Sequence, residues 1–232
     1  MLNIRRAKDR FHTDAGWLHS WHTFSFGHHH DPRYVGFRDL LVINDDTVAG
    51  GGGFAPHGHS DMEILSYVVD GALGHKDSMG NGSTIRPGDL QRMSAGTGVR
   101  HSEMNAAATP TRFLQIWIKP DRPGHPPSYE QKNFSVDDKR DRFRLVASGD
   151  GRDGSVSLHN NVELYASLLA AGARVTAAIE NSRHGWVQIV RGAVTLNGEA
   201  LAEGDGAALS DVPAIEIVGV APQSELLFFH LG

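Results

Sequence analysis

The sequence predicts an all-β protein made of two antiparallel β-barrels in tandem. Three observations support this prediction. Most of the 232 residues form short apolar or alternating stretches separated by turns rich in Gly, Pro, Asn and Asp, a pattern typical of strands and hairpins. A Pro-rich stretch divides the chain near its middle, and the pattern before it recurs after it. The chain is also long enough for two modest domains, each with its own core.

Composition excludes several classes of function. The chain has 22 Lys and Arg against 27 Asp and Glu, a net charge of −5, so we expect no nucleic acid contact and no binding to an anionic membrane. With no cysteine, disulfides, thiolate zinc sites, iron–sulfur clusters and a cysteine nucleophile are excluded. Residues 1–14 are charged and lack an apolar signal region, and no run approaches ~18 apolar residues. We therefore expect a cytoplasmic protein.

The first forty residues are rich in histidine and aromatic side chains. Three histidines are consecutive, from His28 to His30, and Asp31-Pro32 follows them directly. Three consecutive side chains of a strand cannot all face one ion, and the Asp-Pro pair signals a turn. We expect these three histidines to be exposed to solvent. WHTFSF, from Trp21, has the alternation of an edge strand.

The next segment, from Leu40 onward, has the pattern of β-structure. LLVIN predicts a strand, Asp45-Asp46 a turn after it, and the run Gly50 to Gly53 comes next. Because no Gly-Lys-Ser/Thr and no G-x-G-x-x-G follows, this glycine run is not a nucleotide-binding loop. A close backbone approach or a bulge is the simpler use of these glycines.

Further strands complete the first barrel. MEILSYVVDG predicts a strand from Met62, Gly80-Asn81-Gly82 a hairpin turn, and FLQIWIKP a strand from Phe113. Phe113, Gln115 and Trp117 share one face of that last strand. Gln115 either lines the cavity or faces solvent, and the pattern leaves both open.

Two pairs of residues have the spacing of metal ligands. His57 and His59 flank one glycine, and His101 and Glu103 flank Ser102. In a strand, side chains at i and i+2 project from the same face, about 7 Å apart. Each pair can therefore direct two donor groups into one cavity. Three imidazoles and a carboxylate suit a divalent transition metal and leave positions open for substrate or dioxygen.

The alternative is that the two pairs lie on different sheets and their histidines are hydrogen-bonded in turns. The presence of a second pair in similar Gly-rich surroundings favours the metal. Glu63 lies four residues after His59, about 13 Å further along a regular strand. We therefore place Glu63 outside the ligand set, where it would orient a histidine by a hydrogen bond; a surface salt bridge is the other reading.

A connecting segment, KPDRPGHPPSYEQKN, runs from Lys119 to Asn133 and holds four of the ten prolines. Its composition predicts a domain boundary, with residues 1–125 as the metal-binding domain and 126–232 as a second domain. GWVQIVRGAVTL in the second half matches MEILSYVVDGAL in the first, which indicates a duplication. Only His184 stands near the position of the first histidine pair, so the second domain is expected to lack metal ligands.

Several of these segments together resemble the cupin superfamily, and more specifically the pirin family. They are HTFSFGHHHDP, LLVIND, PHGHSDMEILSYVVDG, HKDSMGN, RPGDLQRMSAGTGVRHSEMN and FLQIWIKP, in this order. The resemblance implies two tandem cupin barrels, each an antiparallel double-stranded β-helix, with the C-terminal one degenerate. It implies that His57, His59, His101 and Glu103 bind one divalent metal, usually iron. Nickel, copper, cobalt, manganese and zinc are the other ions such a site accepts.

The chain resembles the bacterial pirins in particular, and these act as quercetin 2,3-dioxygenases, which cleave the flavonol ring with O₂. The resemblance therefore implies a flavonol-like substrate and O₂, and Glu103 would serve as the catalytic base for the flavonol 3-hydroxyl. The alternative is a metal-dependent redox-sensing module that binds a protein partner. This alternative follows from the resemblance to pirins of higher organisms, which look like transcriptional co-regulators. A sugar or small-acid isomerase is a further option, since the fold does not determine the function.

Overall fold

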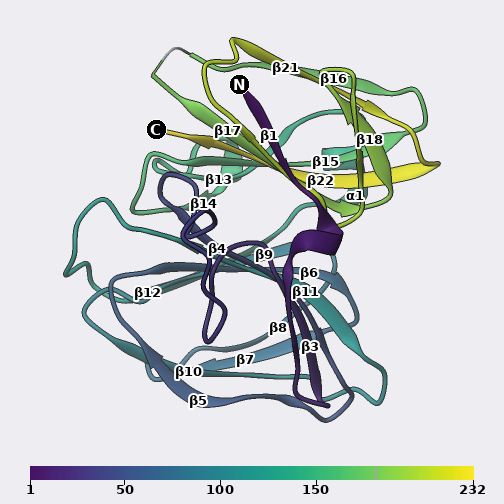
Figure 1. The fold of residues 1–232 in the computed structure, drawn as a ribbon. Coiled ribbons are helices and arrows are strands. Elements are labelled where there is room, and N and C mark those ends of the chain that lie inside the picture. The colour runs from purple at the N-terminus through teal and green to yellow at the C-terminus, as the bar shows by residue number, and fades with distance from the viewer. Residues whose placement is uncertain (181) are drawn as a thin grey trace. The chain divides into compact units, whose positions relative to one another are not determined.

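The computed structural model describes residues 1–180 and 182–232, and it divides into two compact units. We call Phe11–Asn133 with Val156–Asn160 the N-terminal barrel, and Met1–Arg10, Phe134–Ser155 and Asn161–Gly232 the C-terminal barrel. Both consist almost wholly of antiparallel strands (Figure 1). The prediction of an all-β protein with two tandem barrels is confirmed.

The compact units differ from the expected ranges, 1–125 and 126–232, at three places. Residues 1–10 belong to the C-terminal barrel because β1 (Leu2–Arg5) pairs with a strand there, as Leu2 lies opposite Leu209. Residues 126–133 belong to the N-terminal barrel because β12 (Ser128–Asn133) pairs with β9 (Asp89–Ser94). Residues 156–160 join the same barrel, since the Glu130 carboxylate accepts hydrogen bonds from Ser157.

The N-terminal barrel is built from two antiparallel sheets. The larger sheet has the order β12-β9-β6-β11-β4-β3-β2, and the smaller has the order β5-β10-β7-β8 (Figure 1). The strands not yet bounded are β2 (Phe11–Asp14), β3 (Leu18–His22), β4 (Leu40–Val48), β5 (Gly53–His59), β6 (Glu63–Asp70), β7 (Leu73–Asp77), β8 (Gly82–Ile85), β10 (Val99–Met104), β11 (Thr111–Ile118) and the short β14 (Val156–Ser157). The hairpin expected at Gly80 to Gly82 is confirmed by the pairing of β7 with β8.

The expected turn at Asp45-Asp46 was wrong. Both residues lie within β4, which pairs with β3 on one side and β11 on the other. Asp45 remains in the strand because its carboxylate forms two hydrogen bonds, 2.8 and 2.9 Å long, with Arg112 on β11. Asp46, one residue later, is directed to the other face of the sheet, and only 3% of its surface is exposed.

The glycines before β5 allow backbones to approach closely, as expected. A Cβ on Gly50 would lie 2.4 Å from the carbonyl oxygen of Ala108, and one on Gly53 would lie 2.3 Å from that of Glu103. These distances are too short for any other residue without movement of the backbone. Gly53 thus allows β5 to lie directly against β10.

The C-terminal barrel has a sheet in which β1, β20, β17, β22, β15 and β13 follow one another, and a second sheet of order β16-β21-β18-β19. Buried aliphatic side chains from both sheets, with Phe228, form its core. Its elements are β13 (Arg144–Ser148), β15 (Glu163–Ala170), β16 (Arg174–Ala178), β17 (His184–Arg191), β18 (Ala193–Leu196), β19 (Glu199–Ala202), β20 (Gly206–Leu209), β21 (Ala214–Gly219), β22 (Gln223–Leu231), the helix α1 (Val136–Lys139) and the 3₁₀ turns η1 (Ala7–Asp9) and η2 (Arg152–Gly154). Across the described residues, no helix has the length and apolar character needed to span a membrane.

Candidate metal centre

Strands β5 and β10 bring the two predicted ligand pairs together. His57 lies directly opposite His101 in the register of this antiparallel pair. The register then shifts between His101 and Glu103, so that Glu103 pairs with Phe54. Pro56 lies in the segment where the shift occurs and has no N–H for the ladder, which makes a bulge acceptable there. The pairing of β5 with β10 therefore places the two predicted ligand pairs side by side on neighbouring strands.

Three of the four predicted residues form a compact cluster. A ring nitrogen from each of His57, His59 and His101 lies within 4.8 Å of the others. Their ring centroids are 4.4 Å apart for His57 and His101, 4.8 Å for His57 and His59, and 5.0 Å for His59 and His101. This arrangement suits a single transition metal ion, which takes imidazole nitrogens as ligands.

The surroundings of the three histidines favour metal binding. The Nδ1 atom of His57 lies 2.9 Å from the carbonyl oxygen of Ala55 and must donate to it, which leaves Nε2 with a free lone pair. Burial, with the neighbouring His57, lowers the pKa of His59 to about 4 and that of His101 to about 3. Both nitrogens of His101 are buried without a hydrogen-bond partner. A metal ion at the cluster would satisfy one of them, so these residues fit a metal.

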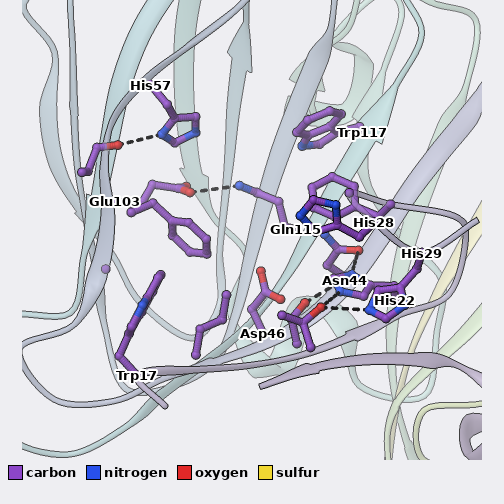
Figure 2. A pocket seen from close by; sticks show the side chains of 18 of the residues that line it. Trp17, His22, His28, His29, Asn44, Asp46, His57, Glu103, Gln115 and Trp117 are labelled. Carbon is purple, nitrogen blue, oxygen red and sulfur yellow. Dashed lines mark hydrogen bonds between the residues drawn. The ribbon is translucent and has the colours of Figure 1, made fainter. Parts of the chain in front are cut away.

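Glu103, on β10, is buried and is held by two neighbours. Its carboxylate oxygens accept a hydrogen bond from the Ser66 hydroxyl at 3.1 Å and one from Gln115 Nε2 at 3.0 Å (Figure 2). Burial raises the pKa of Glu103 to about 7, although these two hydrogen bonds favour the ionised form. The carboxylate is grouped with His101 and His75, not with His57 and His59. Its role as fourth ligand stays a prediction.

His75, on β7, is a residue that the sequence reasoning missed. Only 1% of its surface is exposed, and its Nε2 lies 3.1 Å from an oxygen of Asp77. Burial lowers the pKa of His75, while Asp77 opposes that shift. The signal was present, because His75-Lys76-Asp77 has the same i, i+2 spacing as the two predicted pairs.

Glu63 does orient a histidine, but a different one from those of the cluster. Only 1% of it is exposed, which rules out a surface salt bridge. Its carboxylate accepts a hydrogen bond from Ser94 at 2.8 Å and lies 3.2 Å from Nδ1 of His159. His159 stacks on His125 with ring centroids 3.9 Å apart. Glu63 therefore stabilises the attachment of residues 156–160.

A cavity of about 740 Å³ opens beside the histidine cluster within the N-terminal barrel. Its walls include four large aromatic side chains, namely Trp17, Phe26, Phe54 and Trp117. Trp117 lies edge-on to His59, with ring centroids 5.0 Å apart, and Gln115 projects into the cavity (Figure 2). The cavity reading of Gln115 is confirmed. None of the described residues lining the cavity is Lys or Arg, so the site offers no permanently charged cationic side chain to an anionic ligand.

The N-terminal histidines contribute to this cavity as well. His28 and His30 are exposed, as expected, but His29 is half-buried, and its Nε2 lies 3.2 Å from the Thr13 hydroxyl. His28 and His29 both line the cavity (Figure 2). His28 is thus exposed to solvent and also part of the cavity wall, whereas His30 is only exposed.

Asp46 is a second titratable group in the cavity wall. Burial raises its pKa from 3.8 to about 7, opposed by a hydrogen bond from Ser20 and assisted by the charges of Glu103 and Asp45. The folded protein therefore keeps this proton up to about pH 7, whereas the unfolded chain releases it near pH 4. It follows that Asp46 destabilises the fold progressively as the pH rises through this window.

We therefore expect Asp46→Asn to gain stability relative to the natural chain between pH 4 and pH 8. The relative gain should be on the order of 1–3 kcal/mol. Chemical denaturation of the metal-free proteins at a series of pH values, followed by tryptophan fluorescence, measures it. Parallel stability curves for the two proteins would show that Asp46 is ionised throughout the range.

The two clusters of potential ligands found among the described residues, His57 with His59 and His101, and His75 with His101 and Glu103, both lie in the N-terminal barrel. In the C-terminal barrel, His184 is instead close to Ser210, with 3.1 Å between Nδ1 and the hydroxyl oxygen. The described residues thus concentrate their potential metal chemistry in one barrel.

Comparison with known proteins finds one family match in each half of the chain. The pirin family profile matches residues 4–118, and that of the quercetinase C-terminal cupin domain matches residues 145–231. The chain is 45% identical to quercetin 2,3-dioxygenase of Escherichia coli K12, covering 100% of this chain and 99% of the relative. It is 40% identical to a pirin-like protein of Caulobacter vibrioides, covering 89% and 90%. The crystal structure of the bacterial pirin YhhW in complex with nickel(II), from Escherichia coli, superimposes with a TM-score of 0.95 at 44% identity, covering 100% and 99%.

Proposed function

Because the chain belongs to the pirin family and has its two cupin domains, we propose that it is a metal-dependent dioxygenase. Its reaction would be that of quercetin 2,3-dioxygenase, the opening of the flavonol ring by O₂. The relative of that name covers this chain from end to end at 45% identity. The full-length match applies to both barrels, so the proposal does not rest on the fold alone.

The observation that carries the proposal is the cavity beside the histidine cluster. A flavonol is a planar aromatic molecule whose reactive edge carries a hydroxyl beside a carbonyl. The cavity matches it, because aromatic side chains such as Trp17 and Trp117 form its walls while His57 and His59 lie at one side. Stacking and edge contacts with these rings favour a planar aromatic ligand.

We propose His57, His59, His101 and Glu103 as the ligands of one divalent metal. The first three already form a cluster, and Glu103 is adjacent to His101 in the second group. Bound there, the metal supplies Lewis acidity that lowers the pKa of the flavonol 3-hydroxyl and favours its ionised, electron-rich form.

The side chains of the chain itself would hold and move the proton. Glu103 is the proposed base for the 3-hydroxyl, because its buried carboxylate lies in the wall of the cavity and close to His101. Ser66 and Gln115 fix the position of both carboxylate oxygens. The aromatic walls exclude water, which protects a reactive, electron-rich substrate from side reactions.

Iron is the proposed native metal. A pirin relative has been crystallised with nickel(II), and imidazole-rich sites accept several divalent ions. Metal identity is therefore best tested by reconstitution.

We expect chelator-treated protein to leave quercetin unchanged under air, and reconstituted protein to remove the flavonol absorbance. Iron(II), nickel(II), copper(II), cobalt(II), manganese(II) and zinc(II) would be added one at a time, with about one equivalent bound per chain by elemental analysis. If the protein bound these ions but none of them supported turnover, the proposal would be contradicted and the redox-sensing module with a protein partner would be favoured.

A further inference from the structure

The cavity has a polar wall away from the histidine cluster that the proposed reaction does not use. We call Ser20, His22, Asn44 and Asp46 the β3–β4 wall. Asp46 lies opposite Ser20 on β3 and Phe113 on β11, and Asn44 opposite His22 and Gln115. Residues directly opposite in an antiparallel sheet share one face. The wall therefore lies on the same inner face as Gln115, which contacts Glu103.

The wall lies within reach of a ligand held at the histidine cluster. Strands in a sheet are about 4.8 Å apart, so β3 lies on the order of 10 Å from β11 across β4. In Figure 2, His57 and Glu103 lie on one side of the cavity, and Asp46, Asn44 and His22 lie on another. A ligand of three linked rings, such as a flavonol, is long enough to touch both sides.

Most polar atoms of the wall are already paired with one another. His22 lies 2.8 Å from Asn44 Oδ1 through its Nδ1 and 2.9 Å from the Thr13 hydroxyl through its Nε2. The exception is Asp46, whose Oδ1 is buried without a hydrogen-bond partner. Its carboxylate points toward the middle of the cavity (Figure 2).

A buried carboxylate oxygen without a partner is costly, and a hydrogen-bond donor placed beside it removes the cost. The matching group on a ligand is therefore a donor that carries no negative charge. No described cavity residue is Lys or Arg, and Glu103 adds a second acidic group, so a negatively charged group on the ligand is disfavoured beside Asp46. A phenolic hydroxyl is a neutral donor of this kind, and an aromatic cavity accepts the ring that bears it.

We propose that Asp46 is a substrate-binding residue that accepts a hydrogen bond from a hydroxyl on an outer ring of the flavonol. This inference rests on the proposed function and adds a second point of recognition, away from the hydroxyl and carbonyl at the reactive edge. It makes the site selective for polyhydroxylated flavonols such as quercetin over 3-hydroxyflavone, which has the same reactive edge without the outer hydroxyls.

The test compares the two flavonols on the metal-loaded protein without O₂, so that binding is measured apart from turnover. Quenching of tryptophan fluorescence reports binding, since Trp17 and Trp117 line the cavity. At pH 8, where Asp46 is ionised, we expect Asp46→Ala to weaken quercetin binding about tenfold or more, the usual effect of losing a hydrogen bond to a charged group. Asp46→Asn, which keeps an uncharged acceptor, should weaken it less. The effect on 3-hydroxyflavone should be much smaller.

Asp45→Asn is the matched control, because it makes the same chemical change one residue earlier, on the opposite face of β4. It should leave the preference between the two flavonols unchanged. Flavonols hydroxylated on only the fused ring or only the pendant ring show which hydroxyl Asp46 accepts from.

Equal losses for both flavonols in the Asp46 variants, or no loss for either, would overturn the inference while leaving the proposed function intact. If instead the natural chain bound quercetin but did not consume it when O₂ is admitted, the proposed function would fail. The binding comparison would still decide the role of Asp46.

Discussion

His101→Ala is expected to lose both the bound metal and quercetin turnover. His101 belongs to both groups of potential ligands in the N-terminal barrel, and 2% of its surface is exposed. Loss of a hydrogen-bond partner behind a metal ligand costs about 10–100-fold in affinity, and loss of the ligand itself should cost more. Elemental analysis after dialysis, and the rate of flavonol loss under air, measure the two effects.

The metal-free forms provide a second readout for the same variant. Both ring nitrogens of His101 are buried without partners, a cost that alanine removes while leaving a small cavity. The metal-free variant should therefore be about as stable as the metal-free natural chain, and only the natural chain should gain stability when metal is added. His184→Ala, which removes a histidine of the C-terminal barrel that lies close to Ser210, is the control and should keep metal and turnover. A His101→Ala protein with a full equivalent of metal would remove His101 from the ligand set.

Substitutions of Glu103 separate its two proposed roles. Glu103→Ala should lose metal and turnover together, because it removes a ligand and the base. Glu103→Gln keeps a side chain that can still contact Ser66 and Gln115, so the local fold should survive. Loss of a general base lowers kcat by about 10²–10⁴-fold. Metal content and kcat, measured on the same preparations, distinguish the roles.

Glu63→Ala is the comparison for Glu103, since it removes another fully buried carboxylate of the same barrel. Glu63 contacts Ser94 and His159 rather than the cluster. Its loss should lower the stability by about 1–3 kcal/mol and reduce metal content and turnover less than Glu103→Ala does. If Glu103→Ala kept its full metal content but lost kcat, Glu103 would not be a metal ligand, and its role as general base would still stand.

Those parts of the molecule that depend on local spacing could be predicted from the sequence. His57 with His59, and His101 with Glu103, follow from the alternation of side chains along a strand, and the hairpin at Gly80 to Gly82 follows from turn chemistry. The absence of cysteine excluded thiol-dependent sites, and the net negative charge argued against binding to nucleic acid or an anionic membrane. Each of these inferences needs residues no more than a few positions apart.

Other features depended on residues far apart in the chain. Asp45 and Asp46 resemble a turn locally, yet Arg112 holds the first of them in β4. His75 joins His101 and Glu103 only because β7 pairs with β10.

By itself, then, the sequence determined the all-β class and the tandem arrangement, and it predicted the two pairs of candidate ligands, because the period of a strand is a local property of the chain. Tertiary structure alone decided that Asp46 faces the cavity, that Ser66 and Gln115 hold Glu103, and that residues 1–10 belong to the C-terminal barrel. The physical reason is cross-strand register, which is set by pairing between segments distant in sequence and determines the face on which each side chain lies.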